Sequence, residues 1–406
     1  MDNIQTLKGF RDFLPEQAQK RQYVINILRD VFESYGFSPL ETPVLEYEEI
    51  LTGKYGDEGD KLMYRFEDNG GRKVAMRYDQ TVPLARVVAQ YGSASSPQGQ
   101  PILPMPFKRY QIQNVWRAEN TQKGRFREFL QCDIDTVGSN NPLSDAEILA
   151  IISDCYEALG FKNFKILIND RTIFAGLPQK AIIAIDKLKK IGEEKVQEEL
   201  KALGLPTSTL ESITKAPLTQ NLEAILKTAK NLGIPDDRIQ FEPTLARGLD
   251  YYTGIIIEVE VDGYTVGSVG GGGRYDNLIG MFTKTQIPAV GFAFGFDRVM
   301  EAMEEQKLFP ENRSSTRVLV TIFSPKFMER SIEVCYLLRA KGIASELYLD
   351  ESAKMDKQLK YADQKAIPYA VIIGSEEIDT DTVTLKNLKT REQKRGTLQE
   401  LLNEIK

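Results

Sequence analysis

The chain has 406 residues, enough for two or three domains, and its net charge is −6. Apolar residues make up 42% and charged residues 27% of it, as in a globular protein that folds in water. This balance excludes a protein that holds nucleic acid only through a basic coat, so any such contact needs local basic patches. No apolar run reaches the roughly 20 residues that span a bilayer. The N-terminus has no signal-peptide pattern, so we expect a cytoplasmic protein.

The sequence contains no histidine, and its three cysteines are widely separated: Cys132, Cys155 and Cys335. The lack of histidine removes the commonest metal ligand and the usual general base near neutral pH. It excludes Ser-His-Asp and Cys-His catalysis. The cysteines suggest neither a disulfide framework nor a zinc site. We therefore expect no protein-bound metal and a chemistry that uses arginine, carboxylates, glutamine, tyrosine and backbone groups.

Apolar periodicity predicts the elements of the first part of the chain. The predicted helices cover 17–34, 143–159 and 296–306, and the predicted strands cover 72–78, 107–117, 127–137, 255–261, 264–269 and 289–294. Charged helical segments broken by glycine and proline over 177–233 predict a helical insertion within a larger domain. These elements together predict an α+β domain with a mainly antiparallel sheet.

The pattern changes after residues 308–316, which have the composition of a linker. Strands are predicted over 317–323, 345–349, 369–373 and 382–388, and helices over 325–341, over 353–366 and from about Thr397. Such alternation is typical of a small α/β domain with a partly parallel sheet. We therefore expect one domain over 1–316 and a second over 317–406.

The strand–loop–strand segment Phe107–Val137 is a candidate ligand site. Its polar and aromatic side chains are Arg117, Lys123, Arg125 and Arg127 around the loop and Phe129, Gln131, Asp133 and Asp135 on one face of the second strand. Guanidinium groups pair with phosphate oxygens, and carboxylates accept hydrogen bonds from an ammonium group. The segment therefore suits a nucleoside triphosphate and an amino acid. A solvated hairpin with ordinary surface charges is the alternative.

Two more segments combine polar and aromatic side chains. In Val74–Arg86, Asp79 and Thr81 share one face of a predicted strand and are able to cradle an α-amino group, although a surface ion pair is the alternative. In Leu245–Gly254, one of the adjacent Tyr251 and Tyr252 is able to hydrogen-bond an imidazole. Ordinary core and edge aromatics are the alternative there.

Two glycine-rich segments follow. Gly270–Gly273 permits close approach of the backbone to a ligand, yet it matches neither a P-loop nor a dinucleotide-binding fingerprint. In Ala289–Met300, Arg298 lies in the first turn of a predicted helix, where a cation is poorly placed for the helix dipole. This placement favours a ligand such as a phosphate. A surface arginine is the alternative.

Together these segments resemble the histidyl-tRNA synthetase family, which belongs to the class II aminoacyl-tRNA synthetases, over nearly the whole chain. LARGLDYYTG and GGGGRYDNLIGMF resemble its two histidine-specific signatures, WRAENTQKGRFREFLQCDID resembles class motif 2, and VGFAFGFDRV resembles motif 3. The region around Pro43 resembles motif 1, which forms the dimer interface in that class. MRYDQTVP resembles the LRYDLTVP of one branch, with Gln80 as a departure.

The resemblance implies a class II synthetase antiparallel sheet flanked by helices, with a helical insertion and a C-terminal α/β anticodon-binding domain. It implies a cytoplasmic homodimer that activates L-histidine with ATP, supplied as its Mg²⁺ complex, and transfers it to tRNA(His). Neither DNA nor a membrane is among the expected partners. The attacking carboxylate is already ionised, so this reaction needs no general base and suits a chain without histidine.

The resemblance also assigns residue roles. Arg117 and Arg247 would act on the reacting phosphate and carboxylate. The ATP-binding residues would be Arg117, Glu119, Arg125, Phe129 and Arg298. The histidine-binding residues would be Asp79, Thr81, Gln131, Asp135, Arg247, Tyr251, Tyr252 and Tyr275. The tRNA contacts would be Gln122 and Lys123 at the acceptor end and, in the last domain, the basic run Lys386, Lys389, Arg391, Lys394 and Arg395.

Three alternatives remain. An inactive paralogue, such as the regulatory subunit of ATP phosphoribosyltransferase, usually lacks the C-terminal domain and has eroded signatures. A module that senses uncharged tRNA normally lies within a longer signalling protein. A class II enzyme for another amino acid would lack the two histidine-specific signatures.

Overall fold

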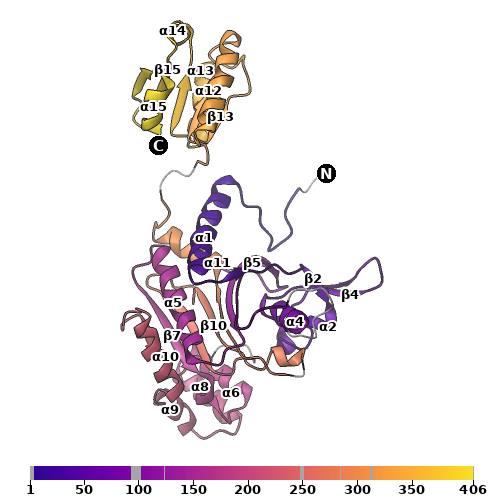
Figure 1. The fold of residues 1–406 in the computed structure, drawn as a ribbon. Coiled ribbons are helices and arrows are strands. Elements are labelled where there is room, and N and C mark those ends of the chain that lie inside the picture. The colour runs from indigo at the N-terminus through magenta and orange to yellow at the C-terminus, as the bar shows by residue number, and fades with distance from the viewer. Residues whose placement is uncertain are drawn as a thin grey trace. The chain divides into compact units, whose positions relative to one another are not determined.

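The computed structural model describes residues 4–92, 102–122, 124–246, 251–283, 285–310 and 314–405. The chain folds into two compact units (Figure 1). The larger unit comprises Met1–Asp12 and Arg21–Leu308, and the smaller comprises Phe13–Lys20 and Phe309–Lys406. Within the described residues, no helix combines the length and the apolar character needed to cross a membrane.

The larger unit is built, in its described residues, on a sheet of eight strands in the order β1-β5-β6-β11-β10-β9-β7-β8. They are Ser38–Pro39 (β1), Phe107–Trp116 (β5), Glu128–Val137 (β6), Phe164–Asp170 (β7), Ile239–Phe241 (β8), Ile255–Val261 (β9), Gly270–Arg274 (β10) and Ala289–Phe294 (β11). The outer pairs β1–β5 and β7–β8 are parallel, and the pairs between them are antiparallel. The expected α+β domain with a mainly antiparallel sheet is therefore confirmed.

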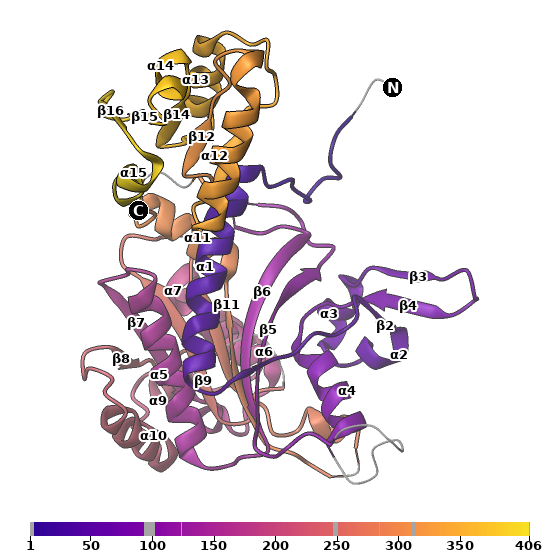
Figure 2. The same ribbon diagram turned by 45° about the horizontal axis from the view of Figure 1, so that its top comes forward.

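Two long helices, Pro15–Ser34 (α1) and Pro142–Ala158 (α5), run across one face of this sheet (Figure 2). Phe32 of α1 and Tyr156 of α5 both contact Phe294 of β11, each with ring centroids 5.6 Å apart. Phe32, Tyr156 and Phe294 are fully buried. These aromatic contacts bury much of this face, on which Arg274 of β10 also forms a buried ion pair with Asp145 of α5, with Nη2 and Oδ2 2.7 Å apart.

The chain between β7 and β8 is largely helical. Its helices are Gln179–Asp186 (α6), Leu188–Ile191 (α7), Glu193–Ala202 (α8), Ser208–Thr214 (α9) and Gln220–Asn231 (α10). Helix α10 packs against α5, and α6 and α7 both contact α8 (Figure 1). The helical insertion that the composition of 177–233 predicts is therefore present in the fold.

A small three-stranded sheet in the order β2-β4-β3 lies before β5 in the chain. Its strands are Leu45–Tyr47 (β2), Arg65–Glu67 (β3) and Lys73–Met76 (β4), and the remaining helices of the larger unit are Glu48–Leu51 (α2), Gly56–Lys61 (α3), Thr81–Tyr91 (α4) and Phe296–Glu305 (α11). The prediction that Thr81 shares a strand face with Asp79 is wrong, because Thr81 is the first residue of α4. Pro83 lies in the first turn of that helix, where a missing N–H costs nothing.

The predicted strand Tyr264–Val269 is also wrong, because these residues form no strand. The strand begins instead at Gly270, and the four glycines that follow Val269 belong to it as β10. They pair with β9 on one side and with β11 on the other. A Cβ atom on Gly272 would lie 2.1 Å from the carbonyl oxygen of Gly291. The glycines therefore allow close contact between neighbouring strands, which a pattern of side chains does not reveal.

The smaller unit has, in its described residues, a sheet in the order β13-β12-β14-β15-β16. Its elements are Val318–Val320 (β12), Met328–Ala340 (α12), Ser345–Leu347 (β13), Met355–Gln364 (α13), Tyr369–Ile372 (β14), Ser375–Asp379 (α14), Val383–Asn387 (β15), Gln393–Gly396 (β16) and Leu398–Ile405 (α15). Strand β12 is parallel to both β13 and β14, and the last two strands are antiparallel. The expected α/β unit with a partly parallel sheet is confirmed. The polar strand β16 was not predicted.

Replacement of Gly272 by alanine is expected to lower the free energy of unfolding by about 1–3 kcal/mol, because the methyl group would overlap the backbone of β11. Differential scanning calorimetry would measure this as a lower midpoint for the transition of the larger unit. Gly70→Ala is the control, because Gly70 is exposed and a Cβ there meets movable side chains. Equal midpoints for Gly272→Ala and the unmodified protein would contradict the close approach of the two strands.

Candidate active site

A cavity of about 910 Å³ opens on the face of the sheet opposite α1 and α5. It is lined by β6, β10 and β11, by the loop between β5 and β6, and by the start of α11. The expected site residues that line it are Asp79, Thr81, Arg117, Glu119, Gln122, Arg125, Phe129, Gln131, Asp135, Tyr251, Tyr252, Tyr275 and Arg298. Two expected residues, Lys123 and Arg247, lie outside the described residues. The structure thus brings every described member of the expected substrate site into one cavity.

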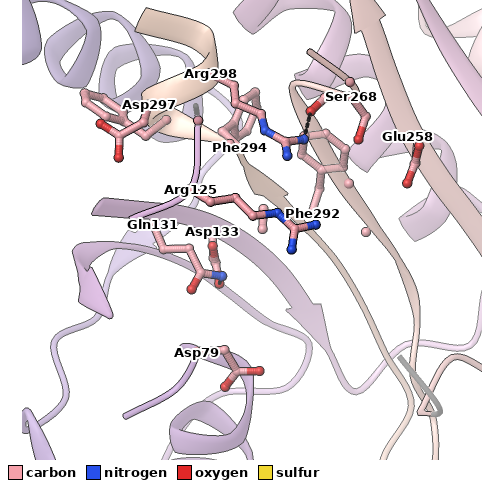
Figure 3. Close-up of a pocket in the computed structure, with 18 of the residues that line it drawn as sticks. Asp79, Arg125, Gln131, Asp133, Glu258, Ser268, Phe292, Phe294, Asp297 and Arg298 are labelled. Atoms are coloured by element: carbon pink, nitrogen blue, oxygen red, sulfur yellow. Dashed lines mark hydrogen bonds between the residues drawn. The ribbon is translucent and has the colours of Figure 1, made fainter. Parts of the chain in front are cut away.

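Backbone carbonyls orient two arginines of the cavity. Arg117 donates through Nε to the carbonyl oxygen of Tyr78 at 3.0 Å, and its guanidinium lies over the rings of Tyr78 and Phe129 at 4.4 and 5.1 Å. Arg298 donates to the carbonyl oxygen of Ser268 at 2.8 Å (Figure 3). Each arginine thus keeps N–H groups available for an anionic ligand while its side chain is held in place.

The loop between β5 and β6 forms a tight turn at the edge of the cavity. Gln122 and Arg125 exchange backbone hydrogen bonds of 2.9 and 3.3 Å. The Arg125 side chain is half exposed and pairs with Glu119 at 3.3 Å. In Figure 3, Arg125 and Arg298 lie toward one end of the cavity and Asp79 toward the other. The cavity therefore has a cationic end that suits phosphate.

Asp79 provides a buried carboxylate at the other end. It accepts hydrogen bonds from the hydroxyl of Tyr55 at 2.8 Å and from the backbone N–H of Val82 at 3.1 Å. Burial raises the pKa of Asp79, and these hydrogen bonds oppose part of the rise. Thr81 lies beside it at the start of α4 and is also buried. The carboxylate of Asp79 and the hydroxyl of Thr81 are both able to accept hydrogen bonds from an ammonium group.

Gln131 and Asp133 lie between these two ends, as Figure 3 shows. Gln131 donates through Nε2 to Oδ2 of Asp133 at 3.2 Å. Both residues are buried, and neither Oε1 of Gln131 nor Oδ1 of Asp133 has a hydrogen-bond partner among the described residues. Burial raises the pKa of Asp133 well above its ordinary range, and the nearby Asp135 adds to the rise. Buried acceptors without partners call for a ligand that donates hydrogen bonds.

Asp135 lies opposite Arg109 in the ladder between β5 and β6, and the two side chains form an ion pair with Nη2 and Oδ2 2.6 Å apart. Tyr275 donates its hydroxyl to the same carboxylate. Burial raises the pKa of Asp135 from 3.8 to about 6, although Arg109 and Tyr275 oppose part of the rise. On the other side of β6, a Cβ on Gly291 would lie 1.9 Å from Oδ1 of Asp135, so only glycine fits there.

The three tyrosines of the site form one aromatic group. Ring centroids lie 4.9 Å apart between Tyr251 and Tyr252 and 5.9 Å apart between Tyr251 and Tyr275. Tyr251 and Tyr252 precede β9, which begins at Ile255. Because Tyr275 also donates its hydroxyl to Asp135, the aromatic group lies next to the buried carboxylate. A flat, partly polar ring fits such a wall.

Sequence reasoning missed three residues of this region. Arg109 stands in a strand with other polar residues, and only the pairing of β5 with β6 in the structure places it opposite Asp135, so the sequence carried no signal for it. Glu258 lines the cavity from β9 (Figure 3). A sequence signal for it was available, because it is the one acidic residue in the otherwise apolar run IIIEV. The departure Gln80 is fully buried and donates through Nε2 to the carbonyl oxygens of Gln113 and Gln131 at 2.8 and 3.2 Å. It therefore joins the start of α4 to both strands of the site.

Comparison with known sequences bears on the whole chain. A sequence profile described as Histidyl-tRNA synthetase matches residues 9–216 and 179–299, and one described as Anticodon binding domain matches residues 317–406. The chain belongs to the histidyl-tRNA synthetase family. Within this family it is 40% identical to the Histidine--tRNA ligase of Cytophaga hutchinsonii over 98% of both chains. It is 40% identical to that of Rhodopirellula baltica over 95% of this chain and 94% of the relative.

Solved structures of the family share the fold. The histidyl-tRNA synthetase from Nostoc sp. PCC 7120 is 30% identical and superposes with a TM-score of 0.87, covering 100% of this chain and 99% of its own. A Bacillus halodurans protein titled "ATP phosphoribosyltransferase regulatory subunit/histidyl-tRNA synthetase" is 23% identical with a TM-score of 0.72, covering 89% and 97%. The second likeness concerns the fold alone. The class II synthetase fold expected from the motifs is confirmed.

The raised pKa of Asp135 predicts how stability depends on pH. The folded chain, with a pKa of about 6, binds this proton more tightly than the unfolded chain, with the ordinary 3.8. This group therefore lowers the free energy of unfolding as the pH rises from about 4 to about 6 and contributes a constant amount above that. Asp135→Asn abolishes this part of the pH dependence.

Thermal unfolding midpoints of the unmodified protein and of Asp135→Asn, measured across this pH range, would test the prediction. Their difference should change up to about pH 6 and then remain level. Asp356→Asn, on the exposed side of α13, is the matched control. A difference that does not vary with pH would rule out an unusual titration of Asp135.

Proposed function

We propose that this chain activates L-histidine with ATP to form histidyl-adenylate and then transfers the histidyl group to tRNA(His). The observation that carries the proposal is the cavity of the larger unit, which combines oriented arginines with buried, partly unpaired carboxylates. Phosphate groups need the arginines, and an ammonium group needs the carboxylates. Membership of the histidyl-tRNA synthetase family supports the same reaction.

ATP would occupy the cationic end, as its Mg²⁺ complex. Phe129 would stack on the adenine and Glu119 would accept from its amino group. Arg117 would contact the α-phosphate, and Arg125 and Arg298 the γ-phosphate. The stacking of Arg117 between two aromatic rings supports its role, because it holds a charged group in a fixed orientation before the charge of the transition state develops.

Histidine would occupy the acidic end. Its α-amino group would lie among Asp79, Thr81 and Gln131, and its imidazole would lie against Asp135. The imidazole pocket would be completed by Tyr251, Tyr252 and Tyr275. The unpartnered oxygens of Gln131 and Asp133 support this placement, since an ammonium group offers them donors.

The adenylation step then follows from proximity. An oxygen of the histidine carboxylate attacks the α-phosphorus, the new carboxyl–phosphate bond forms, and the bond to pyrophosphate breaks. The carboxylate is already ionised, so the step requires alignment and charge stabilisation and no proton transfer. Arg247, which lies outside the described residues, would join Arg117 in stabilising this charge. In the second step a ribose hydroxyl of tRNA would attack the carbonyl carbon, its proton would pass to a phosphate oxygen of the adenylate, and the bond to AMP would break.

The proposal extends to the remaining parts of the chain. Residues 1–316 would form the catalytic domain, with the helical insertion over 177–233, and residues 317–406 would bind the anticodon. Gln122 and Lys123 would approach the acceptor end of the tRNA. We expect a homodimer that acts in the cytoplasm, where tRNA is charged, with no DNA, membrane or protein-bound metal involved.

The regulatory subunit of ATP phosphoribosyltransferase is the second candidate function. The Bacillus halodurans protein, whose title names both activities, favours it at the level of the fold. Three features favour the synthetase: Arg117 and Arg298 line the cavity, their side chains are oriented by backbone carbonyls, and the last domain matches an anticodon-binding profile.

Exchange of labelled pyrophosphate into ATP is expected to depend on histidine and on no other amino acid. Arg117→Met should lower kcat by about 10²-fold or more, because it removes a cation aimed at the reacting phosphate. Arg247→Ala should have a comparable effect. Arg330→Met, on α12 of the smaller unit, should leave exchange unchanged. Absence of exchange with every amino acid would favour the regulatory subunit instead.

Binding of tRNA is expected to use the basic residues after β14, but not all equally. Arg395 pairs with Glu376 and Glu377 at 2.7 and 2.8 Å, and Lys394 pairs with Glu404 at 2.8 Å, so acidic neighbours already compensate these two cations. Lys386, at the end of β15, is thus a stronger candidate for binding phosphate than either of them.

The variant Lys386→Ala should raise the KM for tRNA in charging assays and leave pyrophosphate exchange unchanged. The dependence of that KM on salt should weaken by roughly 0.7–0.9 in log–log slope for each phosphate that the variant no longer neutralises. Lys394→Ala is the matched control with a smaller expected effect. An unchanged KM and slope in Lys386→Ala would exclude this residue from tRNA binding.

A further inference from the structure

The N-terminal segment Leu7–Asp12 lies against the loop between β5 and β6, although more than 100 residues separate the two in the sequence. The carbonyl oxygen of Gly9 accepts hydrogen bonds from the backbone N–H groups of Arg127 at 3.0 Å and Glu128 at 3.4 Å. Gly9 has a φ of +88°, and a Cβ there would lie 2.8 Å from the side chain of Arg127 and 2.9 Å from that of Thr121. A glycine is thus required both by its own backbone and by the closeness of the loop.

Arg11 of the same segment contacts two different walls of the cavity. Its guanidinium lies over the ring of Phe126, 3.2 Å from the centroid, and Phe126 belongs to the loop that carries Arg125. Its Nη2 also donates to Oδ2 of Asp297 at 2.8 Å. Asp297 is in the first turn of α11 and precedes Arg298. One side chain therefore links the loop after β5 to the helix that opposes it.

A second arginine completes the arrangement. Arg21 of α1 donates through Nη1 to Oδ1 of Asp297 at 3.1 Å, so each carboxylate oxygen has its own guanidinium partner. The Asp297 side chain is 12% exposed. Its negative charge is thus compensated by Arg11 and Arg21. The neighbouring Arg298 donates instead to the backbone carbonyl of Ser268, so its positive charge is not compensated by Asp297.

We propose that the segment Leu7–Asp12 is a brace that sets the distance between the two cationic walls of the cavity, and that Arg11 is a positioning residue for ATP. Arg11 is not among the residues that line the cavity, so it acts through Phe126 and Asp297 on Arg125 and Arg298. The inference rests on the proposed contacts of Arg125 and Arg298 with the γ-phosphate. It adds a determinant of ATP affinity outside the motif 2 and motif 3 residues themselves.

A purely structural role for Arg11 has a different consequence. Such a role would lower the stability or the fraction of active protein, and KM values for ATP and histidine would then stay the same. A brace acts on the phosphate end alone, because Asp79, Gln131 and Asp135 have no contact with the segment among the interactions of the described residues. The KM for ATP should therefore change and the KM for histidine should not.

The experiment compares Arg11→Met with the unmodified full-length chain in histidine-dependent pyrophosphate exchange. The KM for ATP should rise by roughly tenfold, since displaced binding groups cost up to about 10²-fold. The KM for histidine should stay within the error of the unmodified value. Arg11→Lys keeps a cation for Asp297 but loses the planar stack on Phe126, so its KM for ATP should lie between the two. Arg29→Ala, on the exposed side of α1, is the control and should change neither KM.

Direct binding of ATP by calorimetry, with thermal unfolding of each variant, separates the outcomes. Should Arg11→Met not fold, Arg11→Lys and Gly9→Ala carry the same comparison. If the unmodified chain shows no exchange, the proposed function fails, and ATP binding alone then decides on the brace. Weaker ATP binding by the folded Arg11 variants supports it. Equal ATP affinity, or equal rises in both KM values, overturns it.

Discussion

The site depends first on the buried ion pair between Arg109 of β5 and Asp135 of β6. Removing two charges from water costs several kcal/mol per ion, so such a pair persists only where the fold holds both groups in place. The antiparallel ladder does this, because it sets the two residues directly opposite each other. Tyr275 adds a hydrogen bond from the next wall. The sheet can thus keep the carboxylate of Asp135 buried close to that of Asp133, where a cationic or hydrogen-bond-donating ligand is favoured.

Glycines, which have no side chain, are as important for the shape of the site as the charged residues are. Gly291 leaves the space that the carboxylate of Asp135 occupies, and Gly272 lets β10 lie close to β11. Helices α1 and α5 seal the opposite face with aromatic rings. The sheet therefore presents mainly apolar side chains toward the helices and many polar side chains toward the cavity. This asymmetry concentrates the polar groups of several strands at one place, where the low dielectric strengthens each of their interactions.

Regular alternation made part of the site predictable. The strand period of two correctly separated Phe129, Gln131 and Asp135 from the apolar face of β6, because a strand buried on both sides must still point successive side chains in opposite directions. The same reasoning failed for Thr81, since a helix begins at that residue. It also failed for the glycines of β10, because β-propensity measures how side chains pack and glycine has none.

By itself, the sequence determined the class of the fold, the two-part organisation of its elements, the family motifs and the chemistry that a chain without histidine can use. These depend on periodicity and on residue types, which are local properties. Tertiary structure alone decided that Arg109 faces Asp135, that Gln80 joins α4 to two strands, and that Arg11 reaches both Phe126 and Asp297. Such contacts join residues far apart in the chain, and their energies depend on distance and burial, which no local pattern contains.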